Sequence, residues 1–205
     1  MSLSKWVFAE FYDLLNAVVE SKVVPYREMT AGQCRGRVLE IGGGTGANLK
    51  YLDRCVSIDT TEPDPHMRKK FSANAIKIGT NASLTSYYGE DLGYLDCTFD
   101  SVFTTLVLCM VDDVEQVINE AYRVLKPGGV FYFYEHVIST KRFGHTFQTI
   151  LDPCWQFFTT GCHLKRDLKR DVMKSNFAKV EICDFYLEIN TLIKIPNIVG
   201  SARKL

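Results

Sequence analysis

The sequence lacks a surplus of charge of either sign. Its 205 residues include 24 lysine and arginine residues and 24 aspartate and glutamate residues, so the formal net charge at pH 7 is +0. Proteins that bind nucleic acid usually present a basic face to the phosphates. We therefore expect no nucleic-acid partner for this chain.

Long apolar runs are lacking too. The longest, "LVLCMV" from Leu106 to Val111, is far shorter than the ~20 residues that a membrane-spanning helix needs. The first residues, "MSLSKWVFAEFYDLL", carry charges at Lys5, Glu10 and Asp13 and do not resemble a signal peptide. We expect a soluble, cytoplasmic protein with no integral membrane segment.

Cysteines with the spacing of a disulfide framework or a zinc site are also lacking. The seven cysteines are scattered, and none belongs to a C-x-x-C pair. An odd, scattered set argues against both kinds of site. Reduced thiols in a cytosol-like compartment are the simplest explanation, and we predict no metal site.

What the sequence does contain is an alternation of apolar strands with helical segments. Strands are predicted over 35–44, 55–62, 83–91, 99–111, 130–137, 178–189 and 197–205. Helices are predicted over 5–24, 44–51, 66–78 and 113–129. This alternation predicts an α/β fold, a Rossmann-like, doubly wound and mostly parallel sheet. The length favours a single domain over residues 1–205.

Four glycines directly after the first predicted strand, in "RVLEIGGGTGANLKYL", indicate a ligand site. A glycine turn at this point lets a ligand contact backbone N–H groups. Gly42, Gly44 and Ala47 satisfy the dinucleotide pattern G-x-G-x-x-A. Glu40, Gly42, Gly44 and Gly46 equally satisfy E-x-G-x-G-x-G, the pattern of class I S-adenosylmethionine (SAM) methyltransferases.

Charge distinguishes these two ligands. A carboxylate at Glu40 would repel a pyrophosphate, whereas SAM carries an ammonium and a sulfonium group. Glu62, at the end of the second predicted strand, is placed to bind ribose hydroxyls, with Asp59 and Asp64 as neighbouring alternatives. The alternative for Glu40 is a strand-end carboxylate that caps the following helix.

Further segments resemble the successive motifs of class I SAM methyltransferases in their order and spacing. These are "RVLEIGGGTG", "TTEPDPHM", "YYGEDL", "TFDSVFTTLVLCMVDD" and "VLKPGGVFYFYEHV". A narrower resemblance rests on "TLVLCMV", "FYEHV", "DPCWQFFTTGCHLKRD" and "IPNIVGSARK". It is to the methyltransferase-like family that includes microsomal alkyl thiol methyltransferases and soluble proteins of the ubiquinone/menaquinone C-methyltransferase type.

This resemblance implies a fold and an activity. The fold is a seven-stranded sheet whose last strand is antiparallel. The activity is methyl transfer from SAM, with S-adenosylhomocysteine as product, to a small, apolar acceptor, of which a thiol is favoured. Two other functions stay open at this point: an NAD-type nucleotide-binding oxidoreductase, and a SAM-binding protein without catalysis.

The resemblance also implies where the cofactor lies. Gly42, Gly44 and the adjoining loop pass under the methionine part, and Glu62 binds the ribose. Glu90 or Asp91 lies beside the adenine amino group.

Two further expectations concern the methionine part and the acceptor. The backbone of Thr105 and Leu106 borders the methionine part of the cofactor. His136, at the end of the fifth predicted strand, is a candidate base that generates an acceptor thiolate. A structural, hydrogen-bonded histidine is an equal alternative.

The N-terminal segment has apolar residues at helical spacing between Lys5 and about Val24. A stripe this broad must be buried against something. The outer face of the sheet and a membrane surface are two possible destinations. We predict a third, in which residues 1–24 form a helical lid that closes on SAM.

Overall fold

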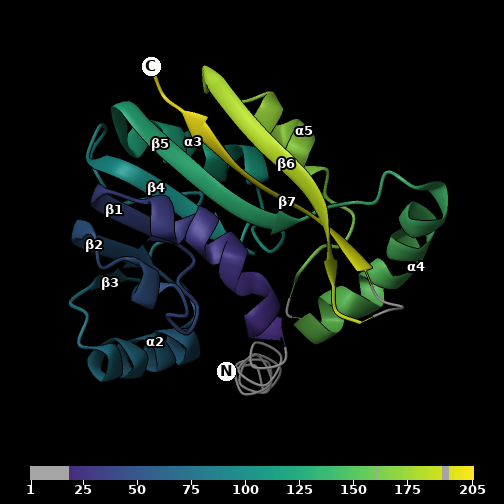
Figure 1. Ribbon diagram of the computed structural model, residues 1–205, viewed down its shortest axis with the longest axis horizontal. Coiled ribbons are helices and arrows are strands. Elements are labelled where there is room, and N and C mark those ends of the chain that lie inside the picture. The colour runs from purple at the N-terminus through teal and green to yellow at the C-terminus, as the bar shows by residue number, and fades with distance from the viewer. Residues whose placement is uncertain (1–18, 160, 191–193) are drawn as a thin grey trace.

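The computed structural model describes residues 19–159, 161–190 and 194–205, and its centre is a seven-stranded sheet. The strands are β1 (Gly36–Ile41), β2 (Cys55–Thr61), β3 (Ser83–Thr85), β4 (Phe99–Thr105), β5 (Leu125–His136), β6 (Lys179–Glu188) and β7 (Lys194–Arg203). Their order is β3-β2-β1-β4-β5-β7-β6 (Figure 1). Only β7 runs antiparallel to its neighbours, β5 and β6, among these pairs. The predicted sheet is therefore confirmed.

Helical elements cover both faces of the sheet, as a doubly wound fold requires. The helical elements of the described residues are a helix over 19–29, η1 (Ala31–Gln33), η2 (Leu49–Tyr51), α2 (Pro65–Ile78), α3 (Val114–Val124), α4 (Arg142–Thr159), which lies to one side, and α5 (Leu168–Met173). The helix over 19–29 lies in front of the sheet in Figure 1, and α3 and α5 lie behind it. The apolar residues of β4 and β5 contact both layers, which explains their nearly unbroken apolar character.

The helix predicted over 44–51 is wrong. The segment forms turns followed by the short 3₁₀ helix η2. Gly44 and Gly46 have φ values of 54° and 80°, in the left-handed region that an α-helix does not use. Asn48 is drawn instead toward Glu40, to which its side chain donates a hydrogen bond at 2.7 Å.

Three other predicted boundaries differ from the structure. β3 is shorter than predicted, and β4 ends at Thr105 because Leu106 adopts a left-handed φ of 58°. α3 ends at Val124, and the "KPGG" segment that follows forms a bulge in β5 between the pairs Phe99–Leu125 and Ser101–Val130. The helix α4 has no predicted counterpart over its first ten residues.

The helix over 19–29 packs on the sheet. Val23 is 1% exposed, and the Tyr26 ring stacks on Phe185 at 3.9 Å and on Tyr134 at 5.2 Å between centroids. Most of the predicted lid, residues 1–18, lies outside the described residues. The described end of that segment is thus held against β5 and β6.

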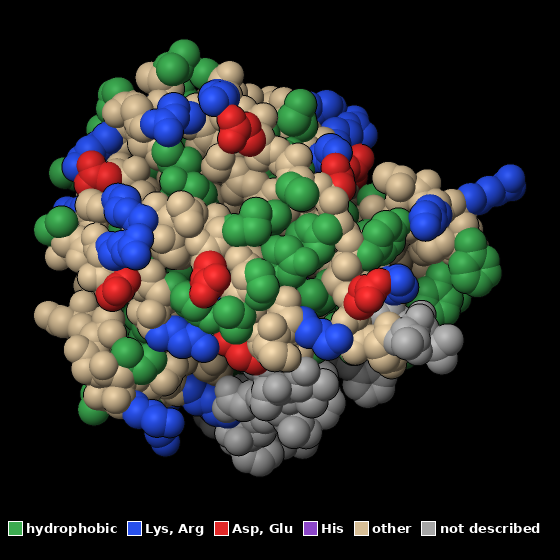
Figure 2. Space-filling model, viewed as in Figure 1, with side chains coloured by type: hydrophobic (Ala, Val, Ile, Leu, Met, Phe, Trp, Pro, Cys, Tyr) green, Lys and Arg blue, Asp and Glu red, His purple; other side chains and the backbone are tan. Residues whose placement is uncertain are grey.

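The helix α4 lies to one side of the sheet and exposes apolar side chains (Figures 1 and 2). Phe143 is 85% exposed, Phe147 56% and Ile150 71%. Within the described residues, no helix combines the length and apolarity that crossing a bilayer requires.

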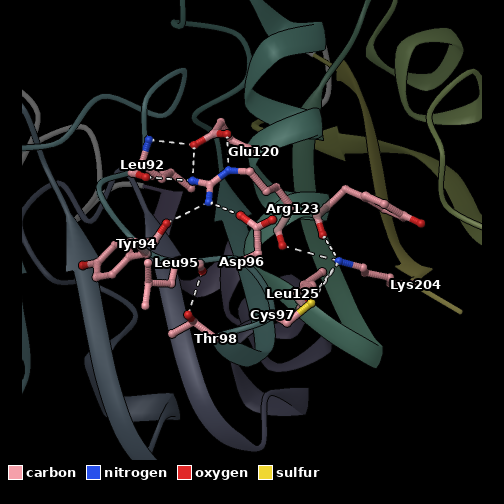
Figure 3. A network of polar contacts seen from close by, with 11 residues as sticks. Leu92, Tyr94, Leu95, Asp96, Cys97, Thr98, Glu120, Arg123, Leu125 and Lys204 are labelled. Carbon is pink, nitrogen blue, oxygen red and sulfur yellow. Dashed lines mark hydrogen bonds and ion pairs between the residues drawn. The ribbon is translucent and has the colours of Figure 1, made fainter.

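A polar network fixes the loop between β3 and β4 onto α3 (Figure 3). The Arg123 guanidinium donates to both carboxylate oxygens of Glu120, to Asp96 and to the carbonyls of Leu92 and Tyr94, at distances of 2.6 to 2.8 Å. Glu90 belongs to the same loop, two residues before Leu92, so the network also steadies a residue of the site described next.

Candidate active site

A cavity of about 330 Å³ lies at the carboxyl ends of β1, β2 and β4. The strand order reverses between β1 and β4, and ligands of open α/β sheets bind at such a switch point. It is lined by Ile41, Gly42, Gly44, Thr61, Glu62, Pro63, Asp64, Met67, Tyr88, Gly89, Glu90, Thr105, Leu106, Val107, Met110, Val111 and Asp112. Two other cavities, of about 360 and 480 Å³, lie beside α2 and between α3 and α5, away from these strand ends.

The glycine turn forms the floor of this cavity. The N–H groups of Gly42 and Gly43 both donate to the Thr61 carbonyl at 2.9 Å. Gly42 has a φ of 72°, and a Cβ atom at this position would lie 2.7 Å from a methyl carbon of Val107. Only glycine lets the chain pass so close to the Val107 side of the cavity.

Glu62 closes the turn. Its two carboxylate oxygens accept hydrogen bonds from the N–H of Gly44 at 2.8 Å and of Asp64 at 2.9 Å. The side chain is largely buried, and burial raises its pKa above the usual value. Each oxygen keeps a free lone pair, so the carboxylate can still accept hydrogen bonds from ligand hydroxyls.

The charges that line the cavity are all negative. The four ionisable carboxylates are Glu62, Asp64, Glu90 and Asp112, and the lining includes neither lysine nor arginine. Such a site disfavours a pyrophosphate and favours a ligand with positive groups. The cavity therefore fits SAM better than NAD.

Glu40 does not line the cavity. It is 1% exposed, and it accepts a hydrogen bond from the Asn48 side chain at 2.7 Å. The Arg27 guanidinium in turn donates to Asn48 at 2.7 Å. Burial raises the pKa of Glu40 to about 7, against the smaller opposing effects of Asn48 and Arg27. Glu40 thus holds the turn after β1 to the helix over 19–29.

The two acidic residues predicted beside adenine occupy different environments. Glu90 lines the cavity and accepts hydrogen bonds from the N–H groups of Asp112 and Asp113 at 2.8 and 3.3 Å. Asp91 is exposed and is not part of the lining.

Thr105 and Leu106 lie on the opposite wall. The Thr105 hydroxyl is buried and has no hydrogen-bond partner among the described residues, which is unusual for a buried polar atom. Leu106 donates its N–H to Tyr134 at 2.8 Å while its φ is 58°. A strained backbone and an unsatisfied hydroxyl at one wall are features of ligand sites, and they fit a polar ligand in this cavity.

The structure places His136 in a cluster that the sequence analysis missed. Its Nε2 lies 2.9 Å from Cys162 Sγ, which lies 3.5 Å from Cys109 Sγ. The hydrogen bond with Cys109 and the nearby His136 ring lower the pKa of the Cys162 thiol. The hydrogen bond with Cys162 and burial raise the pKa of the Cys109 thiol. His136 is not among the residues that line the cavity. No spacing rule links these residues, because they come from three distant segments.

Comparison with known proteins agrees with this geometry. A family described as a methyltransferase domain matches residues 39–133. Human thiol S-methyltransferase TMT1A is 32% identical over 172 residues, which cover 82% of this chain and 70% of that protein. Rat thiol S-methyltransferase TMT1B is 34% identical with the same coverage.

Solved structures show the same fold. A SAM-dependent methyltransferase from Thermotoga maritima, a possible histamine N-methyltransferase, superposes with a TM-score of 0.68 at 21% identity, over 97% of this chain and 98% of that one. A putative methyltransferase from Bacillus halodurans gives a TM-score of 0.72 at 14% identity, over 90% and 99% of the two chains.

Of the three functions that the glycine motif left open, these relationships support SAM-dependent methyl transfer. The predicted enzyme class and cofactor are confirmed, and neither an NAD-type oxidoreductase nor a SAM-binding protein without catalysis agrees with them. The chain belongs to the family of SAM-dependent methyltransferases that includes the thiol S-methyltransferases TMT1A and TMT1B, and SAM is its cofactor.

Proposed function

We propose that this enzyme transfers a methyl group to the sulfur of a small, apolar thiol. The observation that carries the proposal is the 32% identity to a thiol S-methyltransferase over 82% of the chain. The apolar side chains of the cavity wall, which include Leu106, Val107 and Met110, suit an acceptor with little charge of its own.

The residues of the cavity would hold the cofactor as follows. Glu62 accepts hydrogen bonds from the ribose hydroxyls, and the turn at Gly42 and Gly44 passes under the methionine part. Glu90 lies beside the adenine in preference to Asp91, because Glu90 lines the cavity and Asp91 is exposed. The unsatisfied Thr105 hydroxyl is a further hydrogen-bonding group for the methionine end.

When it is bound, SAM supplies a methyl group that is already activated for in-line displacement. The protein then needs mainly to position the acceptor sulfur and to exclude water. A proton-accepting role for His136 stays a prediction, since its Nε2 is engaged with Cys162. Methyl transfer as proposed here does not depend on it.

The lid over residues 1–24 and the cytoplasmic compartment are also proposals. The lid is supported by the described helix over 19–29, which anchors that segment to the sheet through Tyr26. A reducing compartment is supported by the seven free cysteines.

A labelled-methyl assay tests the proposed acceptor. The purified chain is incubated with methyl-labelled SAM and a panel of apolar thiols, amines and quinol precursors, with Glu62→Ala as a cofactor-site control. We expect label on the thiols, and much less label with the variant at a SAM concentration near the natural chain's Kd. Labelled amines or quinols with unlabelled thiols would refute the thiol proposal while leaving the methyltransferase activity in place.

A further inference from the structure

Cys109, His136 and Cys162 bring three metal-binding atoms together beside the active site. Their Sγ and imidazole nitrogen atoms all lie within 4.8 Å of one another. Both cysteines are buried, at 1% and 7% exposed. No other group of three such side chains is found within the described residues.

Backbone contacts fix the three segments relative to one another. The His163 N–H, next to Cys162, donates to the Cys109 carbonyl at 2.8 Å. The Arg166 guanidinium donates a hydrogen bond to the Leu108 carbonyl at 2.6 Å. The Arg166 carbonyl accepts a hydrogen bond from the N–H of Ile138. The loop after α4 is thereby tied both to the turn after β4 and to the end of β5. The donor set is assembled by the fold itself.

The separations are close to, but shorter than, those of ligands on one zinc ion. With Zn–S bonds of about 2.3 Å and Zn–N bonds of about 2.0–2.1 Å, tetrahedral geometry puts two sulfurs ~3.8 Å apart and a sulfur and nitrogen ~3.6 Å apart. The distances here are 3.5 Å between Cys109 and Cys162 and 2.9 Å between Cys162 and His136. An ion would therefore move the two sulfurs apart by ~0.3 Å and the Cys162 sulfur and the His136 nitrogen apart by ~0.7 Å. No two of the three ligand atoms lie more than 4.8 Å apart, so the shifts stay within the reach of side-chain rotations.

Charge also favours a divalent ion. Two thiolates and a neutral imidazole balance the charge of Zn²⁺, so the filled site would be neutral. A neutral complex avoids the large cost of burying an uncompensated charge. Thiolate and imidazole ligands favour zinc over ions such as Mg²⁺, which prefer carboxylate oxygens.

We propose that Cys109, His136 and Cys162 bind one Zn²⁺ ion, with its fourth position open to an exogenous ligand. Three protein ligands are the number found in catalytic rather than structural zinc sites. Cys109 belongs to the same turn as Val107 and Met110, which line the cofactor cavity. The ion therefore lies directly behind a wall of the active site. The site exists whether or not the acceptor is a thiol, so it goes beyond the proposed function.

A disulfide between Cys109 and Cys162 is the competing use of the same atoms. It would require the sulfurs to approach to about 2.05 Å and would leave His136 without its sulfur partner. Zinc uses all three side chains, and for that reason we favour it.

Metal content and cobalt spectroscopy test the site on the full chain. We expect about one zinc per chain, measured by elemental analysis after purification without chelators. After zinc removal, Co²⁺ should give a thiolate-to-cobalt charge-transfer band in the near ultraviolet and the intense visible bands of a tetrahedral ion. Affinity for Zn²⁺, measured against a chelating dye, should fall by at least roughly tenfold in Cys162→Ala and Cys109→Ala.

Cys183→Ala is the matched control, because Cys183 is exposed and remote from the cluster in sequence, and it should bind zinc as the natural chain does. Where a cluster variant fails to fold, zinc-edge X-ray absorption on the natural chain replaces it and should show two sulfur ligands and one imidazole. Weak, octahedral-type cobalt bands would overturn the proposal. So would a natural chain whose intact mass shows a Cys109–Cys162 disulfide and that binds no zinc after reduction.

Discussion

The carboxylate of Glu62 accepts a hydrogen bond from the backbone N–H of Gly44 at 2.8 Å. This contact joins the end of β2 to the glycine turn that follows β1. Because Glu62 also lines the cavity, one side chain both shapes the turn and faces the proposed cofactor site. The consequences can be measured.

Glu62→Ala should weaken binding of S-adenosylhomocysteine. Charge-assisted hydrogen bonds contribute about 1.5–3 kcal/mol, which corresponds to roughly tenfold or more in Kd. Calorimetry on the folded variant measures the loss. Asp59→Ala is the control, since Asp59 contacts Arg37 and does not line the cavity. A large loss in Asp59→Ala or Asp64→Ala, with none in Glu62→Ala, would mean that the ribose carboxylate is misassigned.

Gly42→Ala should lower the free energy of unfolding by more than the left-handed backbone conformation alone explains. Gly42 and Gly128 both have left-handed φ values, 72° and 80°, but only a Cβ at position 42 meets another side chain, Val107. The left-handed conformation costs about 1–2 kcal/mol for alanine. The free energy of unfolding of Gly128→Ala should fall by no more than this amount. Gly42→Ala should also lose roughly tenfold in cofactor affinity. Equal stability and affinity in the two variants would show that the contact with Val107 is unimportant.

Glu40 should make stability depend on pH in the neutral range. Its pKa is about 7 in the folded chain, above the ordinary 4.5, so the folded state holds the proton more tightly than the unfolded state. The free energy of unfolding therefore falls as pH rises from about 4.5 to about 7, by at most about 3 kcal/mol.

Denaturation of the natural chain and of Glu40→Gln, at about pH 5 and about pH 8, measures this effect. The natural chain should lose stability between the two conditions, and the variant should lose less. Glu28→Gln, at an exposed glutamate, should behave like the natural chain. Parallel pH dependence in all three proteins would contradict the assignment.

Arg123→Ala should destabilise the fold by roughly 1.5–3 kcal/mol, because it removes the hydrogen bonds that the guanidinium donates to Glu120 and to the carbonyls of Leu92 and Tyr94. Among the described residues, Glu120 would keep only the bond from the Leu92 N–H. Arg123→Lys should recover only part of this loss, since lysine lacks the planar fork that binds both oxygens of Glu120. Urea denaturation measures both variants. Arg54→Ala, at an exposed arginine, should be neutral, and an equally neutral Arg123→Ala would show that the network adds nothing.

Deleting residues 1–18 should leave a folded domain that loses methyl transfer, if that segment closes on SAM. The helix over 19–29 would remain, held by stacking of Tyr26 on Phe185. Hydrogen exchange in residues 5–18 of the full chain should slow when S-adenosylhomocysteine is added. Unchanged exchange, together with full activity of the truncated chain, would refute the lid.

The sequence by itself determined the existence of the first five strands and their alternation with helices, the glycine turn and the acidic end of β2. These features depend on local patterns: apolar runs predict buried strands, and clustered glycines predict a turn that a ligand can approach closely. The same local reasoning failed for the helix over 44–51, where Gly44 and Gly46 adopt left-handed φ values and the Asn48 side chain is hydrogen-bonded to Glu40.

Only the tertiary structure decided which polar side chains meet. Glu40 was expected to face the ligand. In the structure its carboxylate is buried and accepts a hydrogen bond from Asn48, which follows β1 in the chain. Asn48 in turn accepts one from Arg27, which precedes β1. Cys109, His136 and Cys162 carry no recognisable spacing, and they converge because parallel strands end at one edge of the sheet and the loop after α4 returns to it. Contacts between distant segments depend on how whole elements pack, and no local pattern of residues contains that information.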